Sequence, residues 1–176
     1  MKTIAWKIAA LLSLAASLSA SRGGDQFSVY GGVFDFMRTR HRTFELGMEY
    51  KFYPGWRSPF DFLDFRPLAG IMANMEMSTY LYGGINFDLF PTGHLVIAPG
   101  FAAGWYNKNG GKKLGYPIEF RSGVEISWQL ADQSRFGFHF YHLSNAGLGT
   151  RNPGSESIVF LYDIPIRSGF PFSKQK

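Results

Sequence analysis

A histidine and a serine share one face of the aromatic-rich segment FGFHFYHLSNAGLG, which begins at Phe136. Read as a β-strand, the segment sends alternate side chains to opposite faces, so His142 and Ser144 lie on the same face as three phenylalanines. In the next apolar segment, SESIVFLYDIPI, Glu156 lies on the face of the apolar side chains. A serine, a histidine and a carboxylate can act as the nucleophile, the base and the base-orienting acid of acyl transfer.

These three side chains can meet if the two segments are neighbouring strands of one sheet. Cα atoms two residues apart on a strand are separated by ~6.5–7 Å, and an imidazole that leans toward the serine can span that gap. From the adjacent strand, Glu156 could reach the other ring nitrogen of His142. The alternative interpretation is that His142 and Ser144 are ordinary polar residues at a strand end, because His-x-Ser alone is a weak motif.

The other histidines do not indicate a metal centre. His139 has the opposite parity and is expected in a polar interior, whereas His41 and His94 fall in or beside turns. No set of histidines and carboxylates shows metal-ligand spacing, and the absence of cysteine excludes thiolate sites and disulfides. The residues therefore give no indication of a metal centre.

The composition favours strands and tight turns over helices. The 176 residues, enough for one domain, include 18 Phe, 9 Tyr and 4 Trp together with 21 Gly. Apolar and polar residues alternate along most of the chain, as in TFELGMEYKFY. The pattern predicts eight antiparallel strands, at roughly 26–36, 42–53, 63–73, 77–90, 94–106, 116–130, 135–145 and 155–166.

The first residues read as a secretory signal peptide. Lys2 and Lys7 precede the apolar stretch IAALLSLAASL, and small residues follow it. Cleavage after Ala20 or Ser21 assigns residues 1–21 to the signal and 22–176 to the exported domain; the alternative is a buried N-terminal helix. No later stretch supplies the ~20 apolar residues of a membrane-spanning helix. The exported chain is therefore either soluble outside the cytoplasm or a membrane barrel.

Three features favour an eight-stranded transmembrane β-barrel with its apolar face turned outward. The predicted strands are near the ~9–11 residues that cross a bilayer with tilt. Their polar face mixes acidic, basic and glycine residues, which suits a narrow interior, and aromatic residues such as Trp105 and Trp128 crowd the strand ends. Eight strands enclose just enough space for side chains. The alternative is a secreted lipocalin-like barrel, in which the apolar face would point inward.

Topology then predicts where the loops lie. Both termini of an even-stranded outer-membrane barrel lie in the periplasm, so the external loops fall near 37–42, 74–76, 107–115 and 146–154. These loops carry a collar of basic residues in a chain of formal net charge +5: Arg38, Arg40, Arg42, Lys108, Lys112, Lys113 and Arg151. Such a collar would attract the phosphates of lipopolysaccharide, although it is equally compatible with solvated loops on a basic protein.

The C-terminal part of the chain resembles a known family. HLSNAG followed by NPGSES and LYDIPI is similar to the C-terminal pattern of the PagL-type lipid A 3-O-deacylases, which are eight-stranded outer-membrane barrels. The match runs from about Phe136 to Ile166, and elsewhere it is limited to length, signal peptide and strand pattern. The resemblance implies an esterase of the outer membrane that removes the 3-O-linked acyl chain of lipid A, without a cofactor.

The resemblance also implies roles for individual residues. Ser144 would be the nucleophile, His142 the base and Glu156 the orienting acid. Asn152 and the backbone N–H near Gly147 would stabilise the oxyanion. Asn145 matches the family's Ser-Asn pair without an assigned role.

The expected partners are lipid A or lipopolysaccharide as substrate and the outer membrane itself, with no nucleic acid. Dimerisation could latch an exposed site, so a homodimer stays open. Two other functions also stay open at this point. One is a structural or adhesive barrel without catalysis, and the other is a phospholipase that uses the same triad.

Overall fold

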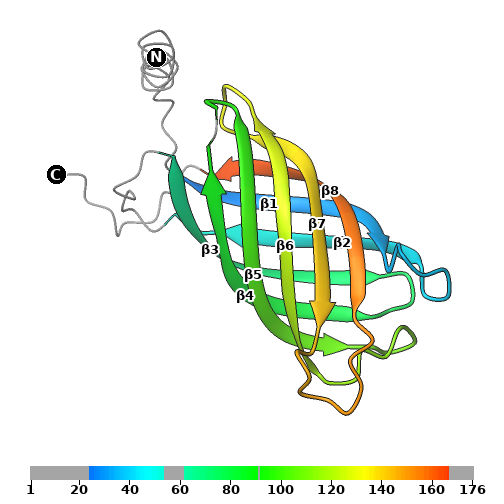
Figure 1. The fold of residues 1–176 in the computed structure, drawn as a ribbon. Helices are drawn as coiled ribbons and strands as arrows, with labels where there is room; N and C mark the ends of the chain where they lie inside the picture. Colours follow the sequence, from blue (N-terminus) through cyan, green and yellow to red (C-terminus); the bar gives the residue numbers. More distant parts are fainter. Residues whose placement is uncertain (1–23, 54–61, 91, 167–176) are drawn as a thin grey trace, which may run out of the picture.

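The computed structural model describes residues 24–53, 62–90 and 92–166. Eight strands form one closed antiparallel barrel in which each strand pairs with its neighbours in the chain and β1 pairs with β8 (Figure 1). The strands are β1 (Asp25–Phe34), β2 (Thr43–Lys51), β3 (Leu63–Asn74), β4 (Thr79–Leu89), β5 (Leu95–Asn107), β6 (Ile118–Gln129), β7 (Arg135–Ser144) and β8 (Ser155–Ile166). The predicted fold and order of strands are confirmed.

Two prolines lie inside strands of the barrel and are accommodated there. Pro67 pairs with Ile85 on β4, and its carbonyl accepts a hydrogen bond of 2.8 Å from the N–H of Phe52. Pro99 pairs with Val124 on β6. Because neighbouring residues maintain both ladders, the missing donors do not interrupt the barrel.

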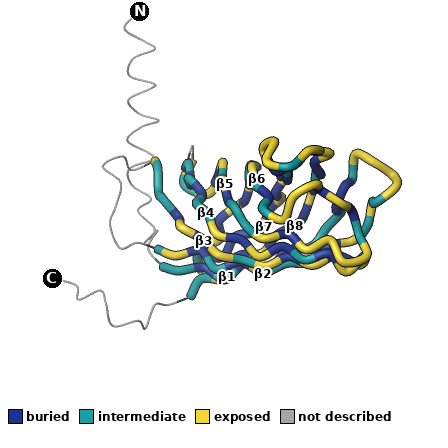
Figure 2. Tube along the Cα trace, turned by 90° about the horizontal axis from the view of Figure 1, so that it is seen from below, coloured by how far each residue is buried: buried dark blue, intermediate teal, exposed yellow. Residues whose placement is uncertain are grey.

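The apolar face of the wall points outward, as the sequence predicts. Along β2, Leu46 is 59% exposed while Glu45 is fully buried, and along β7 Phe138 is 60% exposed while Tyr141 is buried. Figure 2 shows this alternation of buried and exposed positions along the strands. A barrel with an apolar outer surface and a polar interior suits a lipid bilayer rather than water.

Ion pairs and hydrogen bonds share the interior of the barrel with a cluster of buried apolar and tyrosine side chains. The interior ion pairs between strands include Lys51–Glu125 (2.7 Å), Lys51–Asp163 (3.0 Å), Arg66–Asp88 (2.7 Å), Arg135–Asp88 (2.6 Å) and Arg121–Glu49 (2.7 Å). His139 is buried among them, as its parity predicts. Each of these five pairs joins two different strands, and all but Arg66–Asp88 join strands that are not neighbours in the sequence.

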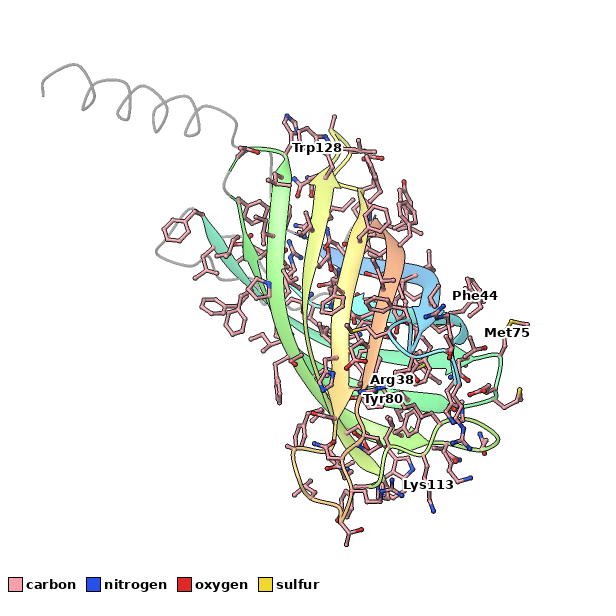
Figure 3. The ribbon with its side chains drawn as sticks, turned by 45° about the vertical axis from the view of Figure 1, so that its right-hand side comes forward. Arg38, Phe44, Met75, Tyr80, Lys113 and Trp128 are labelled. Atoms are coloured by element: carbon pink, nitrogen blue, oxygen red, sulfur yellow. The ribbon has the colours of Figure 1, made fainter. Side chains whose placement is uncertain are left out.

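The two ends of the barrel are identified by the strand pairing and by the residues labelled in Figure 3. Asp25 at the start of β1 pairs with Ile166 at the end of β8, so both strands have these ends at one rim, which we call the terminus end. Trp128 lies toward that rim, and Arg38 and Lys113 lie at the opposite rim, the loop end (Figure 3). The loop end carries the long β5–β6 and β7–β8 connections, which the sequence places outside the membrane.

Some expectations fall on residues that are not described. The signal peptide predicted at 1–21 lies outside the described residues, as does most of the connection between β2 and β3. The described residues contain no apolar helix of membrane-spanning length.

Candidate active site

His142, Ser144 and Glu156 lie together on the outer wall at the loop end. In the strand register, His142 of β7 is directly opposite Glu156 of β8, and Ser144 is opposite Phe120 of β6. All three positions belong to the outward-facing set of their strands, together with the exposed Phe138. The structure therefore brings together the three side chains that the sequence places on one face.

A hydrogen bond joins the histidine to the acid. The Nδ1 atom of His142 lies 3.2 Å from Oε1 of Glu156. The side chain of His142 is 40% exposed, whereas that of Glu156 is 15% exposed. This contact uses one ring nitrogen and leaves Nε2 without a hydrogen-bond partner among the described residues.

Ser144 makes no side-chain hydrogen bond with any described residue. Its place two residues along the strand from His142 leaves a gap that the side chains must close by leaning together. Catalytic hydrogen bonds are often long in the absence of substrate and tighten once it binds. The arrangement is therefore compatible with a serine nucleophile that is not yet engaged by its base.

A second serine lies beside the same histidine, and the sequence analysis did not identify it. Ser122 of β6 is directly opposite His142 in the register and is exposed on the outer wall. Side chains directly opposite in an antiparallel pair have Cβ atoms about 4.5–5.5 Å apart. Only the register between β6 and β7 reveals this neighbour, and an experiment must distinguish it from Ser144.

Glu156 has a second charged neighbour in the β1–β2 loop. An Nη1 atom of Arg38 lies 3.7 Å from Oε2 of Glu156 and donates a hydrogen bond of 3.2 Å to the carbonyl of Gly154. Among the described residues, that carboxylate oxygen has no hydrogen-bond partner although it is buried. Arg38 thus places a positive charge near Oε2 of Glu156, while His142 contacts Oε1.

Gly154 packs directly against the imidazole of His142. Its φ angle is +62°, and a methyl group at its Cα would lie 2.7 Å from Cε1 of the ring. Glycine adopts this left-handed conformation with little strain. The Asn-Pro-Gly turn in the sequence marks the tight bend, but it gives no sign that the glycine touches the histidine.

Asn145 fixes the loop that follows Ser144. Its buried side-chain amide donates hydrogen bonds to the carbonyls of Leu114 (2.9 Å) and Arg151 (2.8 Å). Its Oδ1 accepts a hydrogen bond of 2.9 Å from the N–H of Gly147. Asn145, which had no role in the sequence analysis, therefore connects the β5–β6 loop to the β7–β8 loop beside the candidate nucleophile.

The two residues suggested as oxyanion donors differ in availability. Asn152 accepts a hydrogen bond of 3.1 Å from the N–H of Asn145 through Oδ1. This orientation leaves its Nδ2 group as a donor without a partner among the described residues. The N–H of Gly147 already donates to Asn145, so it could reach an oxyanion only by exchanging that bond.

An aromatic strip descends from the site along the outer wall. Phe138 and Phe160 are opposite each other, with ring centroids 5.6 Å apart and an edge-to-face arrangement. Phe140 lies one step nearer to His142 and contacts Phe36, with ring centroids 5.8 Å apart. The strip begins at the polar groups and offers an apolar surface of the kind that an acyl chain covers.

The described residues contain no cluster of histidine, aspartate and glutamate suited to a metal ion. The side chains that the structure brings together at this site are a serine, an imidazole and a carboxylate. Such a set transfers acyl groups by a covalent intermediate.

Comparison with known proteins gives a family and a fold. The family model described as lipid A 3-O-deacylase (PagL) matches residues 42–165. The crystal structure of the outer membrane enzyme PagL is 21% identical with a TM-score of 0.59, covering 80% of this chain and 99% of that chain. A de novo designed transmembrane β-barrel is 12% identical with a TM-score of 0.51, covering 79% of this chain and 95% of that chain. No curated protein matches the sequence significantly.

Proposed function

The chain belongs to the PagL family of lipid A 3-O-deacylases, and on that premise we propose that Ser144, His142 and Glu156 are its catalytic triad. The family makes it an outer-membrane barrel and an ester hydrolase. The proposal concerns which side chains perform the hydrolysis and from which side the substrate arrives. The observation that carries it is the His142–Glu156 hydrogen bond on the outer wall, directly above the aromatic strip.

The reaction proceeds in two acyl transfers. Oγ of Ser144 attacks the carbonyl carbon of the ester at position 3, and Nε2 of His142 takes the hydroxyl proton. When the tetrahedral intermediate collapses, the bond to the sugar oxygen breaks and the imidazolium protonates that oxygen. Water then attacks the acyl-serine with His142 again as base, which releases the fatty acid and restores the serine. Glu156 holds the ring by Nδ1 and stabilises its charged form.

The oxyanion of each intermediate needs a donor near Ser144. The Nδ2 group of Asn152 supports this role because its orientation is fixed by Asn145 and its hydrogens are unused among the described residues. Gly147 is a second candidate through its backbone N–H, provided that Asn145 releases it.

The outward position of the site suits a substrate that is itself a membrane lipid. Lipid A in the outer leaflet can reach the wall by lateral diffusion, so its acyl chains never need to enter the polar interior. One chain would lie along Phe138 and Phe140, which places its ester near the rim. Export of the chain by the signal peptide expected at residues 1–21 fits this location.

The test compares Ser144→Ala with Ser122→Ala in the purified, refolded barrel. We expect Ser144→Ala to abolish release of the 3-hydroxy fatty acid from lipid A and Ser122→Ala to retain it, as measured by mass spectrometry of the lipid. Full activity in Ser144→Ala would overturn the proposed nucleophile, and loss in Ser122→Ala alone would transfer the role to the β6 serine. Wild-type protein that cleaves glycerophospholipid but leaves lipid A intact would identify a phospholipase instead.

A further inference from the structure

A basic pocket lies at the loop end, between the β1–β2, β5–β6 and β7–β8 loops. It has a volume of about 350 Å³. Its cationic lining residues are Arg38, Arg40, Lys112, Lys113 and Arg151, and the other side chains in the lining include His41 and Asp35. Five cations around one cavity repel each other unless an anion lies between them.

Only part of this charge is neutralised within the protein. Lys112 is buried and pairs with Asp35 at 2.6 Å, and Arg38 lies 3.6 Å from the same carboxylate. Among the described residues, Arg40, Lys113 and Arg151 have no carboxylate partner, and all three are exposed. The pocket therefore keeps three positive side chains for an anion from outside.

The walls of the pocket are fixed to one another. Asn145 joins the carbonyls of Leu114 and Arg151, which belong to two of the three loops. Gly115 approaches Arg151 so closely that a methyl group at its Cα would lie 2.0 Å from the carbonyl oxygen of Arg151. Because these contacts order the loops before any ligand arrives, binding costs less conformational entropy than on free loops.

The pocket also lies next to the candidate active site. Arg38 lines the pocket and lies 3.7 Å from Glu156, which in turn contacts His142. An anion held here would sit at the rim, while an acyl chain from the same molecule extends down the aromatic strip. This is the geometry of a lipid with an anionic sugar head group.

We propose that this pocket binds an anionic oxygen group on the sugar head group of the substrate and so positions the ester at Ser144. The inference rests on the proposed function. Arginine forks and lysine ammonium groups recognise both phosphate and carboxylate. Two sources supply that chemistry: the phosphates on the glucosamine disaccharide of lipid A, and the carboxylates of the first acidic core sugars attached to it.

The experiment uses two double variants that remove the same number of positive charges from the external loops. Arg40→Gln/Arg151→Gln removes pocket residues. Arg42→Gln/Lys108→Gln is the matched control, because both residues lie in the same rim but outside the pocket lining. Hydrolysis is measured in neutral detergent micelles, which remove the contribution of an anionic membrane surface.

We expect the pocket variant to raise KM for bisphosphorylated lipid A about tenfold with little change in kcat, and the control variant to change KM much less. Substrates that lack the 1-phosphate or the 4′-phosphate, or that carry the acidic core sugars, identify the source. The difference between variant and wild type disappears when the recognised group is absent, or grows when the core carboxylates are added. An equal rise in KM for both variants, or a difference that persists on every substrate, would overturn the pocket.

A binding measurement separates this inference from the proposed triad. The probe is the water-soluble bisphosphorylated glucosamine disaccharide left after complete deacylation, titrated calorimetrically into the Ser144→Ala barrel. Saturable binding that is lost in the Arg40→Gln/Arg151→Gln background supports the pocket even if Ser144 is not the nucleophile. Absence of binding at low salt would exclude the pocket even if the triad is correct.

Discussion

Polar side chains on the inner face of β7 and β8 form ion pairs with other strands, whereas those on the outer face form few hydrogen bonds. On the inner face, Asp163 lies 3.0 Å from Lys51, accepts a hydrogen bond from Ser28 and is fully buried. On the outer face, His142 makes one side-chain hydrogen bond, to Glu156, and Ser144 makes none among the described residues. The ion pairs on the inner face of these two strands therefore contrast with the sparsely paired polar groups on their outer face.

The inner face of this strand pair therefore contributes mainly to stability, and the outer face to chemistry. Buried charges inside the barrel are costly unless paired, so removing one partner leaves a charge that nothing nearby neutralises. Polar groups near the rim of the outer wall cost less, because water and head groups are close. Their unused hydrogen-bonding capacity is what a substrate and its oxyanion need.

Two histidines on opposite faces of β7 test the comparison most directly. His142→Asn should lower kcat about 10³- to 10⁴-fold, or about 4–5.5 kcal/mol in barrier height, because the general base is lost. Its unfolding midpoint in urea should stay close to that of the wild type. His139 is buried on the inner face, so His139→Asn should lower the urea midpoint and leave kcat per folded molecule nearly unchanged. Equal losses of kcat in both variants would remove the distinction between the faces.

Breaking an interior ion pair should have the next largest effect. Lys51→Met keeps the volume but leaves Glu125 and Asp163 without their cation, which lay 2.7 and 3.0 Å away. We expect a loss of about 3–5 kcal/mol in the free energy of unfolding, followed by urea titration in detergent. The double variant Lys51→Met/Asp163→Asn should recover part of that loss, since one unpaired charge is gone. A recovery of zero would show that the pair is not coupled.

Gly154→Ala should lower both stability and kcat, because Gly154 has a left-handed backbone conformation and also contacts the ring of His142. The left-handed φ of +62° should cost about 1–2 kcal/mol of stability with any β-carbon. The added methyl also meets the imidazole, so kcat should fall and the ring signals of His142 in NMR spectra should shift. Gly147→Ala is the matched control, with φ +82° and nothing within 4 Å of the added methyl. It should lose similar stability and leave the His142 signals in place.

The strands and their faces could be predicted from the sequence because they depend on local alternation. Every predicted strand boundary lies within two residues of the structure, and the outward set that contains His142 follows from parity alone. The contacts of Arg38, Gly154 and Ser122 could not be predicted in the same way. Arg38 and Gly154 depend on the path of loops, and Ser122 depends on a cross-strand register that alternation does not specify. The turn that sets this register includes Gln133 with a φ of +71°, a conformation that its residue type does not predict.

The smallest expected effect concerns a carboxylate outside both polar regions, in the β6–β7 turn at the terminus end. Asp132 accepts hydrogen bonds from the N–H (3.0 Å) and the hydroxyl (2.6 Å) of Ser134, and these lower its pKa below the ordinary 3.8. A lowered pKa means that the ionised form stabilises the fold above the ordinary value, and that this contribution is lost as the pH falls through the folded-state pKa. Asp132→Asn should therefore have a slightly lower urea midpoint than the wild type at neutral pH. The difference should vanish in acid, since the wild-type carboxylate is then protonated as well. A difference that stays constant with pH would attribute the effect to the shape of the turn rather than to the charge.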